Sequence, residues 1–207
     1  MVSLEEAIAV SDKGSLRNLM LNVVRGDIQK SLSSISLALN SEDSETSHYA
    51  ASVLQDELNE FRVTVQKIYI EIKRGGREQS DYALMLIEYM DQVLKQKVFT
   101  GMEQISFVRM MEEVCEILYY KEKERMSSMH YEYICMRLLE VKEFALCHKW
   151  CERSREEYPN TLSSYTCLLK LYFTCQEREN FFEVMNELKH SNIIIDNETL
   201  ELIRIFS

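Results

Sequence analysis

Glycine and proline are scarce in this chain, which has five glycines and one proline among its 207 residues. Sheets, hairpins and phosphate-cradling loops normally require these two residues, so their scarcity argues against all three. Hydrophobic residues make up 46% of the chain, which is enough for one compact domain or for an extended row of small units. The composition therefore predicts helices nearly throughout.

Basic residues and long apolar runs are lacking as well. The chain has 24 lysines and arginines against 34 acids, and its formal net charge of −10 repels nucleic acid phosphates and anionic lipid headgroups. No run of about 18 apolar residues exists, and acids stand in MVSLEEAIAV where a signal peptide carries basic residues. We therefore expect a cytoplasmic protein with no nucleic-acid partner and no direct membrane insertion. Its helical start leaves open a longer protein whose anchoring segments tether this part to the inner face of the membrane.

Patterns that indicate metal binding are also few. The six cysteines lie within apolar helical patterns, which predicts reduced thiols. Cys147 and Cys151 are one helical turn apart in CHKWC and could share a face as soft zinc ligands, but a second pair is missing unless Cys167 or Cys175 folds back nearby. We interpret Cys147 and Cys151 as small apolar residues at helix contacts. We expect no metal and no cofactor.

Signals for catalysis are similarly weak. The chain offers no serine elbow and no glycine-rich loop, and its four histidines are widely separated. Adjacent acids such as Glu112 and Glu113 diverge from a helix and are expected to face solvent, so they do not form an acid–base pair. We interpret His48, in SHYAAS, as a packing residue that bonds across to a neighbouring helix or turn. The sequence therefore predicts that the protein is not an enzyme.

Helical periodicity and end signals divide the chain into three regions, 1–74, 75–127 and 128–207. Two glycines among charged residues in 73–81 mark the hinge between the first two regions. In the last region, Asp196 is the expected N-cap residue of a closing helix. The expected helices outside the repeat described below cover 15–24, 27–39, about 42–72, 82–99, 102–124 and 196–206.

A first resemblance concerns residues 38–58, ALNSEDSETSHYAASVLQDEL. They resemble a HEAT-type repeat, in which an acid-rich turn precedes a helix with paired alanines and then valine or leucine. The matching residues are Asp43, Glu45, Ala50, Ala51 and Leu54. The resemblance implies a helical-repeat unit in the first region, in which the small alanines admit a close neighbouring helix.

The last region repeats itself at an offset of 34 residues. At this offset apolar or aromatic residues stand opposite one another: Tyr131 pairs with Tyr165, Ile134 with Leu168, Leu138 with Tyr172, Cys147 with Phe181 and Cys151 with Met185. The region resembles a pair of tetratricopeptide repeats, and Pro159 falls where that family ends its second helix. Tyr131 and Cys135 stand in place of the family's tryptophan and glycine. The two resemblances together imply an all-α protein, an α-solenoid of antiparallel helix pairs, HEAT-like and then tetratricopeptide-like, with a C-terminal capping helix.

An α-solenoid of this kind presents a concave surface made by the first helices of its repeats. Residues between the core positions of 128–140 and 162–174 are therefore expected to be exposed there and to contact a protein partner. Tyr133 is a candidate aromatic anchor. The candidate partner-binding residues are Glu132, Tyr133, Arg137, Ser164 and Lys170.

Three stretches, VSLEEAIAVSDKGSLRNLML, SETSHYAASVLQDELNEF and SNIIIDNETLELIRIF, carry one more resemblance. They are similar to the cytosolic repeat region of membrane-anchored proteins encoded with Pel-type exopolysaccharide synthases in Gram-positive bacteria. This implies a non-catalytic scaffold whose partners are the glycosyltransferase or the cyclic-dinucleotide receptor of the synthase. The alternative is a free cytosolic peptide-binding tetratricopeptide module or co-chaperone, although the mixed charge of the groove counts against its carboxylate-clamp form. A helical hydrolase is the third interpretation.

Overall fold

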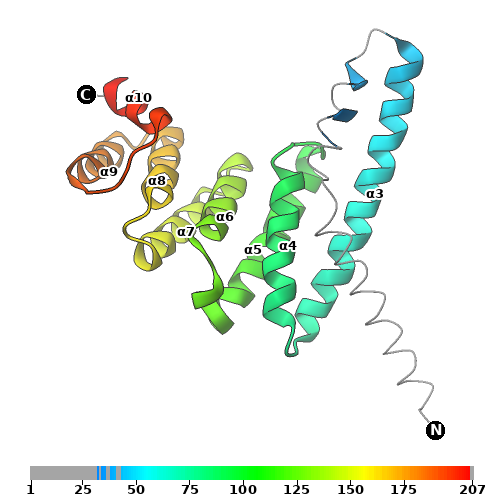
Figure 1. Ribbon diagram of the computed structural model, residues 1–207, viewed down its shortest axis with the longest axis horizontal. Helices are drawn as coiled ribbons and strands as arrows, with labels where there is room; N and C mark the ends of the chain where they lie inside the picture. The colour runs from blue at the N-terminus through cyan, green and yellow to red at the C-terminus, as the bar shows by residue number, and fades with distance from the viewer. Residues whose placement is uncertain (1–31, 33, 36–37, 41–42, 206–207) are drawn as a thin grey trace. The chain divides into compact units, whose positions relative to one another are not determined.

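The computed structural model describes residue 32, residues 34–35 and 38–40, and residues 43–205 (Figure 1). The helix expected over 15–24 and most of the one expected over 27–39 lie outside these residues. The described chain is all-α, as predicted. Its elements are α3 (Ser44–Arg74), α4 (Gln79–Leu94), α5 (Gly101–Glu122), a 3-10 helix (Lys123–Arg125), α6 (Ser128–Glu140), α7 (Phe144–Glu157), α8 (Leu162–Cys175), α9 (Arg178–His190) and α10 (Asn197–Ile205).

The chain divides into two compact units, residues 1–99 and residues 100–207. The first unit contains α3 and α4, and the second contains α5 to α10. The glycine hinge expected within 73–81 is the turn between α3 and α4, so it lies inside the first unit. Within each unit, consecutive helices pack as antiparallel neighbours.

Signals at both ends of α3 explain its length of 31 residues. At its start the Asp43 carboxylate accepts a hydrogen bond from the backbone N–H of Thr46 at 3.0 Å, which satisfies a donor that the helix itself leaves unpaired. At its end Lys73 and Arg74 complement the negative end of the helix dipole. Gly75 follows with φ of 79°, a conformation that favours glycine. The predicted long helix after an acidic turn is confirmed.

The first turns of α3 differ from the HEAT-like expectation. Ala50 is buried, but Ala51 is exposed, so one of the two alanines packs and the other does not. His48 and Tyr49 are exposed as well. The prediction that His48 packs against a neighbouring element is therefore wrong, because this side of α3 faces away from the side that Ala50 buries.

Further along α3, an apolar core joins it to α4. The ring of Phe61 is fully buried, and its centroid lies 5.3 Å from the centroids of Tyr89 and Phe99. Burial of such aromatic and aliphatic side chains is the main force that holds two helices together. Further fully buried apolar side chains of these two helices are Val65, Ile68, Ile72, Ala83, Leu86, Ile87, Met90, Val93 and Leu94.

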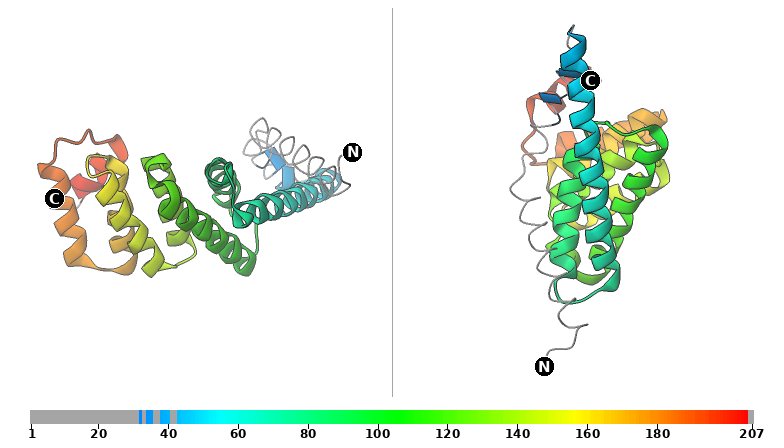
Figure 2. Two further views of the ribbon diagram at one scale, coloured as in Figure 1. Left: turned by 90° about the horizontal axis from the view of Figure 1, so that it is seen from below. Right: turned by 90° about the vertical axis from the view of Figure 1, so that its right-hand side faces the viewer.

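The second unit contains two helix pairs of the same construction, α6 with α7 and α8 with α9 (Figure 2). The first helices of the pairs begin 34 residues apart, at Ser128 and Leu162. The second helices, which begin at Phe144 and Arg178, have the same separation. The spacing of these helices is therefore the offset at which the sequence aligns with itself.

The turns inside the two pairs also share their backbone geometry. Lys142 has φ of 63° and Gln176 has φ of 61°, so each pair turns at a residue in the left-handed region. The next residue in each turn donates its backbone N–H to the carbonyl oxygen five residues earlier, at 2.9 Å in both turns. This hydrogen bond closes the end of the first helix in each pair.

The last helix, α10, begins as the sequence predicts. Oδ1 of Asp196 accepts a hydrogen bond from the backbone N–H of Thr199 at 2.7 Å. This bond lowers the pKa of Asp196 below its ordinary value, because it favours the ionised carboxylate. Asp196 is thus the N-cap residue of α10.

Candidate functional site

Two stripes of incompletely buried side chains lie on the first helices of the two pairs. On α6 the stripe follows helical spacing through Met129, Glu132, Tyr133 and Met136, and none of these side chains is fully buried. On α8 the corresponding stripe runs through Ser163, Thr166, Lys170 and Phe173. α6 and α8 contact each other, so the stripes belong to adjacent helices. We call these eight residues the α6/α8 face.

The structure places the five predicted partner-binding residues in different environments. Glu132 and Tyr133 are half-buried and Lys170 is exposed, and all three belong to the α6/α8 face. Arg137 and Ser164 are 7% and 0% exposed, so the prediction that they are exposed is wrong. Whether any of the five contacts a partner stays a prediction.

Local hydrogen bonds and ion pairs account for the burial of these two polar side chains. Ser164 Oγ donates to the backbone carbonyl of Thr161 at 2.8 Å, a bond within the first turn of α8. Arg137 pairs with Glu140 at 3.3 Å, one turn later on α6. Helical spacing places a residue on one side of a helix, but it does not tell which neighbouring helix covers that side.

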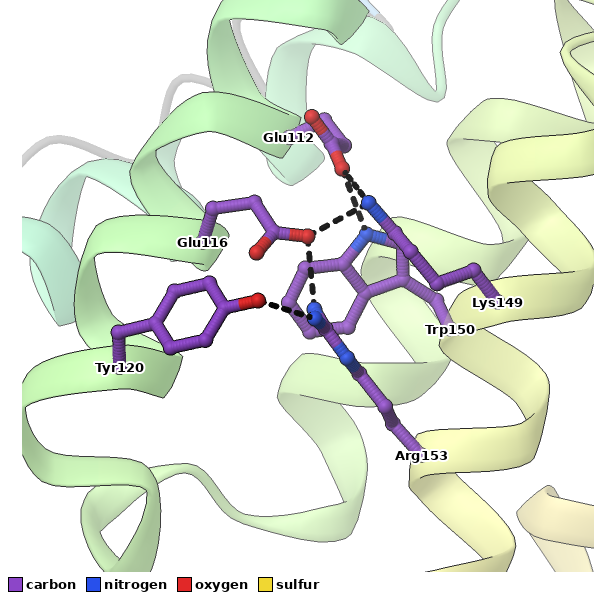
Figure 3. Close-up of polar contacts among 6 residues, drawn as sticks. All are labelled: Glu112, Glu116, Tyr120, Lys149, Trp150 and Arg153. Atoms are coloured by element: carbon purple, nitrogen blue, oxygen red, sulfur yellow. Dashed lines mark hydrogen bonds and ion pairs between the residues drawn. The ribbon is translucent and has the colours of Figure 1, made fainter.

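A polar cluster between α5 and α7 was not anticipated from the sequence (Figure 3). Lys149 Nζ lies 2.5 Å from Glu112 Oε1 and 2.5 Å from Glu116 Oε1. Arg153 donates to the same Glu116 oxygen at 2.7 Å, and Trp150 Nε1 donates to Glu112 Oε1 at 3.1 Å. We call the whole group the α5–α7 clamp, and its members are Glu112, Glu116, Tyr120, Lys149, Trp150 and Arg153.

Arg153 is the central cation of this clamp. Its guanidinium carbon lies 4.0 Å from the ring centroid of Tyr119, 4.6 Å from that of Trp150 and 5.6 Å from that of Tyr120. Cations held over aromatic faces in this way gain from the ring quadrupole, and more so when water is partly excluded. The side chain of Arg153 is 13% exposed, so these contacts are made largely away from solvent.

The electrostatics of the clamp point to a structural role. Partial burial alone would raise the pKa of Glu116, but hydrogen bonds from Arg153 and Lys149 outweigh it and hold this pKa below its ordinary value. The prediction that Glu112 faces solvent is wrong, since it is buried beneath Trp150 and Lys149, whereas Glu113 is exposed as predicted. Because Lys149 and Arg153 pair with these two carboxylates, the clamp joins α5 to α7.

The three histidines of the second unit have separate local partners. Nδ1 of His130 accepts from the backbone N–H of Ser127 at 2.9 Å and so caps α6. His148 bonds the Tyr172 hydroxyl at 3.2 Å, between α7 and α8. His190 bonds a backbone carbonyl of its own helix at 2.8 Å. Each imidazole is therefore explained by a local contact.

Four cysteines from three helices meet in the core of the second unit. Sγ of Cys151 on α7 lies 3.6 Å from Sγ of Cys135 on α6, and the Cys147 thiol donates to the backbone carbonyl of Cys135 at 3.3 Å. Cys167 on α8 is buried in the same region and interacts with Cys135 and Cys151. Cys167 therefore does lie near Cys151. Even so, among the residues that the structure describes, no three His, Cys, Asp or Glu side chains are arranged to hold a metal ion.

Comparisons add no family to this description, since no protein-family model, no curated protein and no solved structure matches the chain. Across the described residues, no helix is both long enough and apolar enough to cross a membrane. The fold and the geometry of the α6/α8 face are therefore the basis for assigning a function.

Proposed function

We propose that this protein is a non-catalytic scaffold for protein–protein interaction, and that the α6/α8 face is its contact surface. The observation that carries the proposal is the repeated construction of the two helix pairs, which places three incompletely buried side chains of each stripe at corresponding positions. Met129 corresponds to Ser163, Glu132 to Thr166 and Met136 to Lys170, each 34 residues later. Stacked helix pairs of this kind build extended binding surfaces.

The tetratricopeptide-like interpretation supports this proposal. Tyr131, which stands in place of the family's tryptophan, is fully buried, and its ring centroid lies 6.0 Å from that of Trp150. Cys135, in place of the glycine, is buried where α6 approaches α7. Both positions thus contribute to helix packing, as they do in the family that the sequence resembles. On this basis we infer an α-solenoid, with α10 as its capping helix.

The chemistry of the α6/α8 face suits a partner with apolar anchors. The side chains of Met129 and Phe173 are 55% and 62% exposed, and the side chain of Tyr133 is half-buried. Methionine and aromatic side chains adapt to a docked segment and supply much of the energy of such contacts. Lys170 is the cation among the eight residues of the face, whereas a clamp for a terminal carboxylate requires several cations. The face therefore favours the scaffold over the co-chaperone.

The resemblance to the repeat region of Pel-type exopolysaccharide proteins identifies the first partners to test. On this proposal the α6/α8 face contacts subunits of a synthase at the inner face of the membrane. The alternative is a free cytosolic module that binds a short peptide tail in the same face. Both accounts place the contact on the α6/α8 face, and they differ only in the partner that binds there.

A capture experiment tests the proposal. The full chain is immobilised, incubated with a lysate of the source cell that includes solubilised membranes, washed with salt and examined by mass spectrometry. Lys170→Glu reverses a charge on the α6/α8 face, and Arg178→Glu is the matched control on α9, where residue 178 is also exposed. We expect membrane-associated synthase subunits with the wild type and the control, and their loss with Lys170→Glu.

Two results would count against this account. Recovery of only soluble proteins that share a short tail would favour the peptide-binding module. Equal recovery by wild type, Lys170→Glu and Arg178→Glu would remove the α6/α8 face as the contact surface.

A further inference from the structure

A pair of thiols lies in contact between α6 and α7. Cys135 and Cys151 are 1% and 0% exposed, and their sulfur atoms are 3.6 Å apart. A disulfide bond requires about 2.05 Å between the sulfurs, so the pair would have to close by roughly 1.5 Å. Rotation of two side chains and a small shift of the helices can supply such a movement.

The surroundings of this pair consist of further thiols. Cys147 reaches the backbone carbonyl of Cys135 from the same helix as Cys151, and Cys167 approaches from α8. All six cysteines are free, and four of them share this one region of the core. Helix packing alone explains a small apolar residue at each position, but alanine would satisfy that requirement as well.

We propose that Cys135 and Cys151 form an intramolecular disulfide bond when the protein meets a hydroperoxide, and that this bond locks α6 to α7. With hydrogen peroxide, one thiolate attacks a peroxide oxygen and the O–O bond breaks, which forms a sulfenic acid and hydroxide. The hydroxide takes up the proton that the thiol released and becomes water. The second thiol then displaces hydroxide from the sulfenic sulfur, which leaves the disulfide and a second water. The two sulfurs lose two electrons, and the two peroxide oxygens gain them.

Burial controls when this reaction occurs. It raises the pKa of the Cys135 thiol well above its ordinary value, so the closed fold keeps this thiol protonated and slow to react. Oxidation therefore proceeds when α6 and α7 separate transiently, and the neighbouring helix brings the second thiol back within reach as the pair closes. The bond then encloses only the short stretch between residues 135 and 151, which contains the turn at Lys142.

The expected effect is a more stable second unit. A cross-link between α6 and α7 removes conformations from the unfolded chain, and native geometry already holds the two sulfurs near each other. We expect the thermal midpoint of the oxidised protein to lie several degrees above that of the reduced protein.

Peptide mapping tests the proposal directly. The full chain is reduced, treated with hydrogen peroxide, denatured, alkylated and digested without reduction. We expect a loss of two mass units and a linked pair of peptides that contain Cys135 and Cys151. A linkage that maps elsewhere, or no internal linkage under conditions that oxidise Cys175, would overturn the proposal.

Variants separate this pair from the other thiols. Cys135→Ser and Cys151→Ser should each abolish the internal linkage and the rise in thermal midpoint. Cys115→Ser, at a buried thiol on α5, and Cys175→Ser, at a half-buried one, should keep both. If either serine variant at the pair fails to fold, the mapped linkage in the wild type still decides the question. An internal linkage that survives in Cys151→Ser would contradict the assignment.

Discussion

Replacement of Trp150 by alanine should be among the most damaging single changes to the second unit. The side chain is fully buried, and its ring centroid lies 5.9 Å from that of Tyr119 on α5 and 6.0 Å from that of Tyr131 on α6. Truncation opens a cavity at the contact of these helices with α7. We expect the free energy of unfolding to fall by about 3–5 kcal/mol, the usual cost of truncating a buried aromatic side chain.

Trp150→Phe separates the packing of the indole from its hydrogen bond. Phenylalanine keeps much of the apolar ring but removes the Nε1–H that donates to Glu112 Oε1 at 3.1 Å. Lys149 still contacts the same oxygen at 2.5 Å, so Glu112 is not left without a partner. We expect a loss of about 1.5–3 kcal/mol, which corresponds to one hydrogen bond to a charged acceptor.

Urea unfolding followed by far-ultraviolet circular dichroism is the appropriate assay. Trp150 is the single tryptophan of the chain, so its replacement removes the usual fluorescence signal. Met102→Ala is the control, because that side chain is 84% exposed on α5 and its truncation should change the unfolding free energy by less than about 0.5 kcal/mol. The reasoning is refuted if Trp150→Ala costs less than about 1 kcal/mol, or if Trp150→Phe costs as much as Trp150→Ala.

Two further predictions concern charge and backbone. Ionised Glu116 stabilises the fold above the pKa it has in the unfolded chain, and this contribution is lost as the pH falls through its lower folded pKa. Glu116→Gln should therefore lower the free energy of unfolding by about 1–3 kcal/mol at pH 7. It should also make this free energy less sensitive to acidification below about pH 5. Equal acid sensitivity of the wild type and the variant would contradict this prediction. Gln176→Gly should raise the unfolding free energy by about 0.5–1 kcal/mol, because the residue has φ of 61°. Lys170→Gly, within a helix, should lower the unfolding free energy by about 1 kcal/mol. If thermal melts shift the midpoint in the same direction for both glycine variants, the backbone argument is wrong.

Features that depend on local sequence could be predicted well. Asp43 at the start of α3 and Asp196 before α10 have the residue type that caps a helix, and both cap one. The glycines at 75 and 76 end α3 within the expected hinge. The offset of 34 residues gave the spacing of the two helix pairs, because equivalent residues in a repeated sequence meet equivalent neighbours.

Features that depend on contacts between distant helices could not be predicted in the same way. Glu112 and Trp150 are separated by 38 residues, and the bond between them exists only because α5 packs beside α7. Arg137 was expected at the surface because it lies between the core positions of a first repeat helix, yet its long aliphatic stem permits burial while Glu140 pairs with its guanidinium. His48 shows the opposite error, since it lies beside an apolar stripe but faces solvent.

Site-specific photo-crosslinking tests the central claim most directly, because it reports which surface of the chain touches a partner. A benzophenone amino acid is placed at position 170 on the α6/α8 face, or at position 183 on the exposed side of α9, and irradiated in a lysate of the source cell. The account predicts one discrete crosslinked protein from position 170 and none of the same mass from position 183. Crosslinking of that protein from position 183 alone, or of no protein from position 170, would contradict it.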